Sequence, residues 1–174
     1  MDSKALQKIS YGVYVVTSLK DGLYNGQIAN RVIQVTADPS IIALSINKKN
    51  LTHEYIQSSR ILAISVICED APLSFIGCFG LHSGRDTDKL ERTEYKIGET
   101  GAPMVLEHAV TSMEARVPQE MSVRTYTIFV GEIIGGEILT TDICMTYDHH
   151  HEIKGETTPK AAPSYVSHEA TKEK

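Results

Sequence analysis

Short apolar runs rich in β-branched and aromatic residues recur along the chain and are separated by turn-forming residues. The first run, residues 11–17, is almost continuously apolar, which predicts a strand buried on both faces. Asp21-Gly22 and Asn25-Gly26 predict turns that bound a short hairpin arm. Because strands dominate and helical patterns are short, we expect a mainly β closed barrel with helices at its corners rather than a doubly wound α/β sheet.

The remaining runs extend this pattern. Further strands are expected at residues 28–36, 41–47, 61–67, 113–117 and 126–134, with residues 137–140 as a candidate for a seventh. Helices are expected over residues 4–9, over residues 51–57 with Asn50 as N-cap, and after Asp70 with Pro72 in the first turn.

The length of 174 residues suits one domain that buries a core without help from disulfides or metals. After residue 153 the sequence becomes polar and proline-containing, so we expect a domain over residues 1–153 and an extended tail over residues 154–174. A net charge of −5 argues against nucleic acid or anionic membrane as a partner. The sequence has no run near the roughly 20 apolar residues of a membrane span, and its N-terminus lacks the apolar core of a secretion signal. We therefore expect a cytoplasmic protein.

Two groups of residues invite a metal interpretation, and neither supports one. Cys68, Cys78 and Cys144 lie far apart without a CxxC pair, so they predict three reduced, mostly buried thiols in a reducing compartment. The histidines at 149–151 would alternate between the faces of a strand and lack obvious distant ligands. A surface or subunit-contact role is favoured for them, and no metal is predicted.

The segment SGRDTDK at residues 83–89 concentrates groups that can bind a phosphate. Ser83, Arg85 and Lys89 place a hydroxyl and two cations in one loop, and a dianion held out of water needs charge-assisted bonds. The alternative is a solvated loop with ordinary local ion pairs, which the segment taken by itself favours.

Two further segments add polar groups near expected strand ends. Residues 47–52 leave a strand and enter a helix, whose free N–H groups beside two lysines form a ready anion site. The strand at 28–34 carries Asn30, Arg31 and Gln34 among apolar residues, and a polar heterocycle lying along it would give them partners. Simple alternation toward water is the other explanation, and this strand alone favours it.

Five ordered segments together resemble the flavin reductase-like family of FMN-binding split-barrel proteins. They are NGQIAN with QVTADP at 25–39, IIALSINKKNLTH at 41–53, CFGLHSGRDTDK at 78–89, GETGAP at 98–103 and YTIFVGE at 126–132. The similarity spans roughly residues 5–165 and is greatest to the flavin domain at the front of high-molecular-weight rubredoxins. The resemblance implies a mainly β, FMN-binding split β-barrel with short peripheral helices. A rubredoxin would follow in such fusions and none follows here, so we expect any rubredoxin-like partner to be a separate protein.

The resemblance also assigns residues to the parts of FMN. Those that would line the isoalloxazine ring are Asn30, Arg31, Val32, Ile33 and Gln34. Those that would meet the ring edge and ribityl chain are Ser45, Ile46 and Asn47. Those at the phosphate are Asn50, Thr52 and Ser83, with Arg85 and Lys89 balancing its charge.

The function implied is that of an oxidoreductase passing hydride or electrons from NAD(P)H or a redox partner to rubredoxin, a ferric complex or flavin. Many members that use nicotinamide carry histidine where this chain has Tyr126, which makes reduction by another redox protein a serious option. We expect a homodimer in which the second copy covers the flavin ring. The alternatives are a non-catalytic barrel that stores flavin or heme, and a barrel whose polar loops are purely structural.

Overall fold

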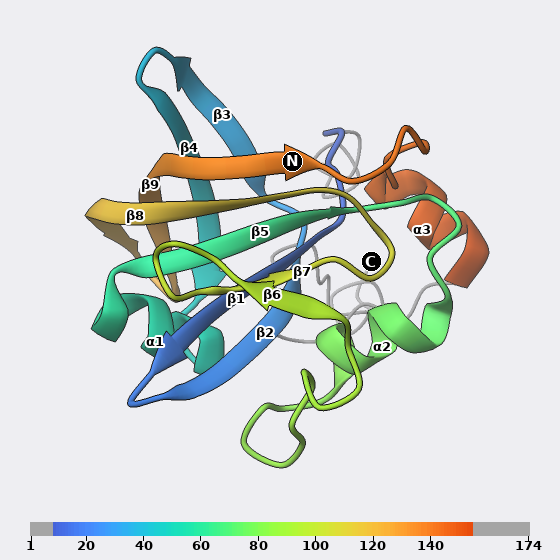
Figure 1. The fold of residues 1–174 in the computed structure, drawn as a ribbon, viewed down its shortest axis with the longest axis horizontal. Coiled ribbons are helices and arrows are strands. Elements are labelled where there is room, and N and C mark those ends of the chain that lie inside the picture. The colour runs from blue at the N-terminus through green and yellow to red at the C-terminus, as the bar shows by residue number, and fades with distance from the viewer. Residues whose placement is uncertain (1–8, 155–174) are drawn as a thin grey trace, which may run out of the picture.

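The computed structural model describes residues 9–154, and its main element is a seven-stranded antiparallel sheet (Figure 1). The strand order is β2-β1-β5-β8-β9-β4-β3. These strands are β1 (Tyr14–Lys20), β2 (Leu23–Ala29), β3 (Val32–Ala37), β4 (Ser40–Asn47), β5 (Ile61–Ile67), β8 (Ala109–Val123) and β9 (Tyr126–Ile138). The other described elements are the pair β6 (Tyr95–Ile97) and β7 (Pro103–Val105), and the helices α1 (Leu51–Ser59), α2 (Leu73–Leu81) and α3 (Tyr147–Lys154). The mainly β prediction is confirmed.

The two edge strands of the large sheet, β2 and β3, are consecutive in the chain and are joined only by Asn30 and Arg31. Two residues cannot cross an open sheet of seven strands, so the sheet curls until its edges approach each other. The backbone N–H of Ser45 on β4 donates to the Arg31 carbonyl at 3.1 Å and holds the connection. No strand pairing joins β2 to β3 in the described chain, so the barrel is split along this seam.

The observed strand bounds correct two predictions made from the sequence. One strand over residues 28–36 is wrong, because the chain leaves β2 after Ala29 and enters β3 at Val32. Asn25-Gly26 is not a turn, since it lies inside β2 and pairs with β1. Asp21-Gly22 does form the turn between β1 and β2, with φ values of 52° and 77°, the positive range that tight hairpins favour.

The strands β8 and β9 are longer than expected. β8 continues beyond the predicted 113–117 because a register shift between Arg116 and Gln119 accommodates Pro118. β9 likewise absorbs the start of the candidate strand at 137–140. The two strands pair along most of their length as one long hairpin.

The helix starts were predicted with mixed success. α1 begins directly after Asn50, as expected, although the Asn50 side chain makes no capping bond. α2 begins after Pro72, so the predicted cap at Asp70 is wrong. The helix predicted at 4–9 and the tail predicted at 154–174 lie, except for one residue each, outside the described residues.

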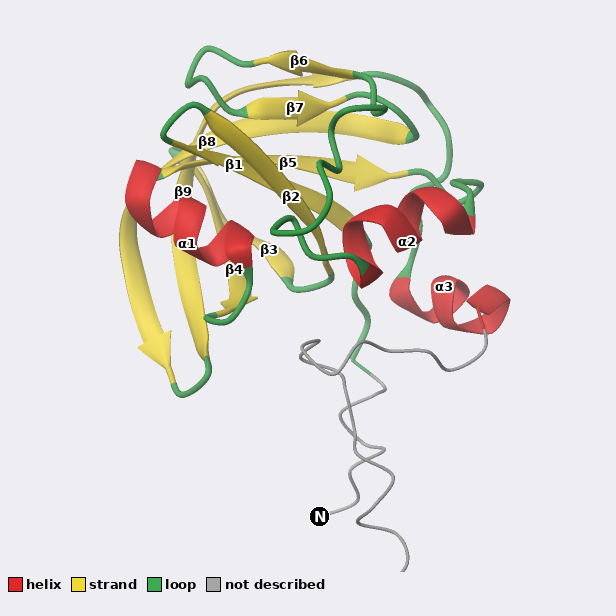
Figure 2. Ribbon diagram, turned by 90° about the horizontal axis from the view of Figure 1, so that it is seen from below, coloured by secondary structure: helices red, strands yellow, loops and turns green. Residues whose placement is uncertain are grey.

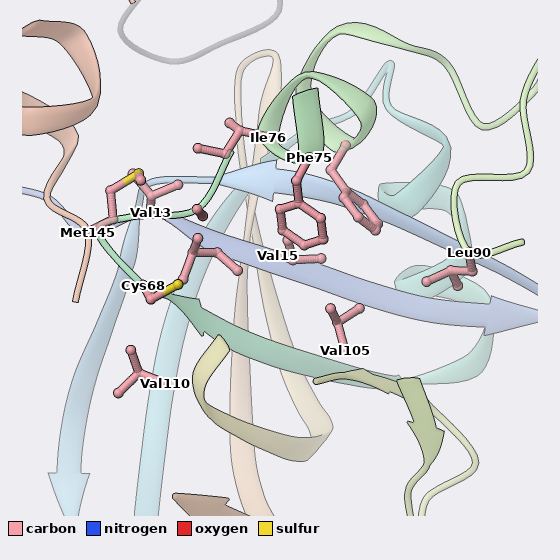
Figure 3. Packing of buried hydrophobic residues seen from close by; sticks show 12 residues of the cluster. Val13, Val15, Cys68, Phe75, Ile76, Leu90, Val105, Val110 and Met145 are labelled. Atoms are coloured by element: carbon pink, nitrogen blue, oxygen red, sulfur yellow. The ribbon is translucent and has the colours of Figure 1, made fainter. Parts of the chain in front are cut away.

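Apolar side chains cover both faces of β1. Val15 packs against α2 in a cluster with Phe75 and Phe79 (Figure 3), whereas Val16 faces the barrel interior with Phe129. Both valines are fully buried, which confirms the prediction made from their run. α1 and the neighbouring pair α2 and α3 lie on opposite sides of the barrel (Figure 2), so each side of β1 has its own apolar cover.

A buried carboxylate holds the loop between β6 and β7. Glu114 on β8 accepts hydrogen bonds from the backbone N–H groups of Glu99 and Thr100 at 2.8 and 2.7 Å. A Cβ on Gly98 would lie 2.4 Å from a Glu114 oxygen, so glycine is what allows this approach. Burial raises the pKa of Glu114, but the bonds from Thr100 and Glu99 outweigh it and hold the pKa below its usual value.

Candidate functional site

The first turn of α1 is fastened to β2 by two polar contacts. Asn25 Nδ2 donates to Thr52 Oγ1 at 2.7 Å, and both residues are buried. Asn50 Nδ2 donates to Gln27 Oε1 at 3.0 Å, so this side chain binds β2 and makes no capping bond to the helix. The contacts place the N-terminus of α1, the positive end of its dipole, beside the middle of β2.

The Ser83–Lys89 loop approaches the same place and contacts both β2 and α1. A Cβ on Gly84 would lie 1.9 Å from Asn25 Oδ1 and 3.2 Å from a Leu51 methyl, so only glycine fits there. Arg85 Nη2 lies 3.3 Å from Glu54 Oε2 on α1. The two segments predicted to meet a phosphate therefore converge in the structure, although they lie far apart in the sequence.

Lys89 is the most enclosed cation at this place, with 6% of its surface exposed. Its Nζ donates to the carbonyl oxygens of Gly26 at 2.9 Å and Phe79 at 3.2 Å. Among the described residues no carboxylate lies within ion-pair distance of it. Burial lowers the pKa of Lys89 to about 8, against a smaller opposite effect of Cys78. The surroundings of Lys89 thus bring its pKa closer to neutral, and no residue of the described chain serves as its counterion.

The residues predicted to line a flavin ring lie along the seam. Asn30 is buried, Arg31 and Val32 are half-buried, and Ile33 and Gln34 are exposed on the edge strand β3. Within the described part of the chain, no hydrogen bond or ion pair joins these five side chains to the phosphate-end residues. The structure therefore places them as a separate group at the barrel rim.

The Arg31 side chain turns toward Tyr11. Its guanidinium carbon lies 4.8 Å from the centroid of the Tyr11 ring, a cation–π contact. Its Nη1 atom is buried and has no hydrogen-bond partner among the described residues. A polar heterocycle beside the seam is the kind of group that supplies such a partner.

The predicted group at the end of β4 is divided between the surface and the core. Ser45 and Asn47 are half-buried, and Asn47 Oδ1 accepts a hydrogen bond from the N–H of Lys49 at 3.0 Å. Ile46 is 1% exposed and its side chain belongs to the barrel core. Tyr126 stands opposite Asn47 in the β4–β9 pairing, so it lies at this same end of the barrel.

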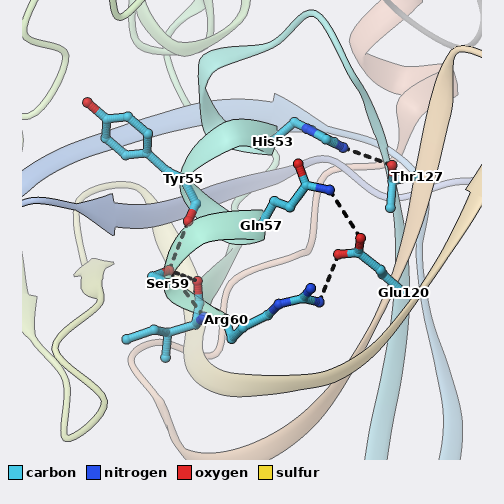
Figure 4. Close-up of polar contacts among 8 residues, drawn as sticks. His53, Tyr55, Gln57, Ser59, Arg60, Glu120 and Thr127 are labelled. Carbon is cyan, nitrogen blue, oxygen red and sulfur yellow. Dashed lines mark hydrogen bonds and ion pairs between the residues drawn. The ribbon is translucent and has the colours of Figure 1, made fainter.

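Sequence reasoning missed the contacts that fix α1 from its other side (Figure 4). The buried ring of His53 shares a 2.8 Å hydrogen bond, through Nε2, with Thr127 Oγ1. Burial lowers the pKa of His53, with a smaller opposite effect of Glu120. Glu120 in turn accepts hydrogen bonds from Gln57 at 3.1 Å and Arg60 at 2.8 Å. Only the polar residues at helical spacing on α1 could have signalled this second anchoring face.

The histidine run lies in α3, so its expected strand conformation is wrong. His149 Nε2 is 4.0 Å from a Glu69 oxygen, and the His151 ring packs edge-on at 4.3 Å from Tyr147. Within residues 9–154 no three His, Cys, Asp or Glu side chains are grouped to hold a metal ion. None of the described helices has the length and apolarity needed to cross a membrane.

The antiparallel sheet is curled, and a helix N-terminus and a basic loop converge beside its seam. These features define a split β-barrel suited to a phosphorylated cofactor. Residues 6–153 match the flavin reductase like domain, and the chain belongs to that family. It is 44% identical over 166 residues to high molecular weight rubredoxin of Moorella thermoacetica, covering 95% of this chain and 72% of the relative. It is 43% identical over 165 residues to ferric-chelate reductase (NAD(P)H) of Archaeoglobus fulgidus, covering 95% and 98%.

The fold agrees with these sequence relationships. The crystal structure of flavoredoxin from Methanosarcina acetivorans superposes with a TM-score of 0.69 at 25% identity, covering 74% of this chain and 69% of that one. The resemblance, the split-barrel class, the flavin cofactor and the oxidoreductase role predicted from the sequence are confirmed.

Proposed function

We propose that FMN binds with its phosphate between the first turn of α1 and the Ser83–Lys89 loop, and with its ring along the seam at β3. The observation that carries this proposal is the enclosed Lys89 ammonium, which has only carbonyl partners in the described chain. A buried cation without a counterion is costly, and a phosphate placed beside it removes that cost.

The hydrogen-bond donors fit a phosphate. The ammonium of Lys89 has three N–H donors, and its two carbonyl partners leave one for a ligand. Thr52 Oγ1 accepts from Asn25, and Ser83 Oγ accepts from the N–H of Arg85 at 3.1 Å, so both hydroxyl protons remain available. Arg85, whose pairing with Glu54 engages one of its five donors, balances the remaining charge.

The ring end of the proposed site is incomplete in one copy of the chain. Ile33 and Val35 on β3 are 62% and 53% exposed, although large apolar side chains are usually covered. We infer that a second copy packs there and covers the ring, which makes the protein a homodimer. The three free cysteines fit a cytoplasmic location.

FMN accepts hydride as a pair of electrons and releases electrons singly, while the protein orients the ring and tunes its potential. The proposed reaction is NAD(P)H-dependent reduction of a ferric chelate. Its support is the 43% identity to ferric-chelate reductase (NAD(P)H), which extends over 95% of this chain and 98% of that protein. In this chain, the residues of the seam and of α1 bind the cofactor and exclude water from one side of it.

A second candidate is an electron carrier that donates to a separate rubredoxin-like protein. Two observations favour it: the 44% identity to high molecular weight rubredoxin, and Tyr126 at a position where the resemblance predicts histidine for nicotinamide use. A non-catalytic store of flavin or heme would use the same barrel without turnover.

An anaerobic titration of the FMN-loaded full chain separates these functions. The proposed reductase loses its visible flavin band on addition of NADH or NADPH and recovers it when ferric EDTA is added. Failure of the nicotinamides to bleach the band, with bleaching by a reductase protein and recovery on adding rubredoxin, would establish the carrier instead. A chain that takes up no FMN would refute the proposed site.

A further inference from the structure

Cys68 and Cys144 lie opposite each other where the chain entering α3 meets the end of β5. Two backbone hydrogen bonds of 2.8 Å flank them, from Met145 N–H to Ile67 O and from Glu69 N–H to Ile143 O. Bonds made by the neighbours on both sides identify the cysteines as a non-hydrogen-bonded antiparallel pair. Figure 3 shows Cys68 and Met145 together at this place.

This pairing brings the two side chains close. In a non-hydrogen-bonded antiparallel pair the Cα atoms are about 4.5 Å apart and both side chains leave on the same face. A disulfide needs Cα atoms roughly 4.4–6.8 Å apart. Both thiols are free in the structure, so only side-chain rotation separates them from a bond.

The surroundings give the two thiols different roles. Cys144 is exposed, so a small oxidant reaches it directly, whereas Cys68 is 5% exposed. Burial, together with a smaller effect of the Asp70 carboxylate, raises the pKa of Cys68 to about 11. Because Cys68 stays protonated and enclosed, the first reaction falls to Cys144.

We propose that Cys68 and Cys144 are a modification site that forms a reversible intramolecular disulfide when a peroxide reaches Cys144. The Cys144 thiol takes one oxygen from hydrogen peroxide and releases one water, which gives a sulfenic acid. The Cys68 sulfur then attacks the Cys144 sulfur and the S–O bond breaks. The leaving oxygen takes the Cys68 proton and departs as a second water. One peroxide is reduced for each disulfide formed, and a thiol reductant restores the pair.

The cross-link has a structural consequence that does not depend on the flavin reaction. It ties residues 142–146, which lead into α3, covalently to the end of β5. Tyr147, the first residue of α3, already donates its N–H to Tyr11 O at 2.7 Å, and Tyr11 carries the Arg31 contact. The disulfide therefore fixes the start of α3, which is linked to Arg31 at the seam through Tyr11.

The test treats the folded, reduced full chain with hydrogen peroxide and counts thiols after denaturation. We expect the count to fall from three to one, with an intact mass lower by two hydrogen atoms and a cross-linked peptide containing residues 68 and 144. Thermal unfolding of the oxidised chain should occur at a higher temperature, and dithiothreitol should reverse every change.

Two variants make the result specific. Cys144→Ser changes an exposed side chain and should remove both the cross-link and the thermal shift, whereas Cys78→Ser, the matched control, should retain both. Three remaining thiols, an oxygen added to Cys144 without loss of Cys68, or a cross-link through Cys78 would each overturn the proposal.

Discussion

The ammonium of Lys89 lies 2.9 Å from the carbonyl oxygen of Gly26, inside a shell that leaves 6% of the residue exposed. This bond ties the end of the Ser83–Lys89 loop to β2, the strand whose Asn25 also holds Thr52. Carbonyl oxygens compensate a buried charge less completely than a carboxylate does. Variation of Lys89 is therefore the most direct test of the proposed phosphate site.

Lys89→Met keeps the length of the side chain and removes its charge. We expect FMN binding to weaken by ~1.5–3 kcal/mol, roughly a 10–150-fold rise in Kd, through loss of a charge-assisted hydrogen bond. Quenching of FMN fluorescence measures Kd, and thermal unfolding of the apoprotein checks the fold. Lys96→Met removes an exposed charge on β6, outside both phosphate-end segments, and should change Kd by less than about 3-fold. Equal affinities in the two variants would remove Lys89 from the site.

The lowered pKa of Lys89 predicts opposite pH dependences for stability and for binding. Its pKa is about 8 in the folded chain against an ordinary 10.5, so between these values the unfolded state binds more protons. The contribution of Lys89 to apoprotein stability therefore rises with pH across that window, and below pH 8 the cost of the buried charge is fully present. FMN favours the charged form, so its affinity should fall as pH rises above 8. In Lys89→Met, urea unfolding should no longer show the rise of stability with pH, and FMN titrations should no longer show the fall of affinity.

Gly84→Ala tests the contact between the basic loop and β2. Because a Cβ there would lie 1.9 Å from Asn25 Oδ1, the loop or Asn25 must move and the Asn25–Thr52 bond is disturbed. We expect a loss of about 1–3 kcal/mol in unfolding free energy, typical of overpacking, together with weaker FMN binding. Gly77→Ala is the matched control, because its Cβ would meet only a Leu81 methyl at 3.8 Å. A Gly84→Ala protein that keeps wild-type stability and affinity would contradict the loop placement.

Glu114→Gln tests the carboxylate that holds the β6–β7 loop. Loss of charge-assisted bonds to Glu99 and Thr100 should cost about 1–3 kcal/mol at neutral pH. Since the folded pKa lies below the ordinary 4.5, the wild-type carboxylate contributes fully above pH 4.5 and loses its contribution as pH falls through the lowered value. The free energy of unfolding of the variant, measured with urea, should therefore fall less at acidic pH than that of wild type. Glu132→Gln, at an exposed position on β9, should behave as wild type.

The sequence predicted the strands that are buried on both faces, as at residues 61–67, because they are short, nearly continuous apolar runs rich in β-branched residues. It missed the break at Asn30 and Arg31, because apolar residues on both sides made the segment look like one strand and the connection forms only when the sheet curls. The histidines of α3 were placed in a strand because three identical residues carry no periodicity. The short strands β6 and β7 have too few residues for any pattern to develop.

The sequence was enough to name candidate residues for the site, but not the contacts that hold them in place. Ser83, Arg85 and Lys89 could be selected because hydroxyls and cations in one loop suit a phosphate. Nothing in that loop indicates that Lys89 is enclosed, since burial depends on β2 and α2. Asn25 was assigned to a turn, and its contact with Thr52 becomes visible only when two segments 27 residues apart are packed together.

The two-residue link between β2 and β3 sets a mechanical limit on the barrel. Three successive Cα–Cα steps reach at most about 11 Å, so the mouth between the edge strands can open no wider than this tether allows. The tether depends on the number of residues in the link rather than on their side chains, and a lengthened link would let the two edges drift apart. The width of the seam at this end is thus set by the covalent chain rather than by any single contact.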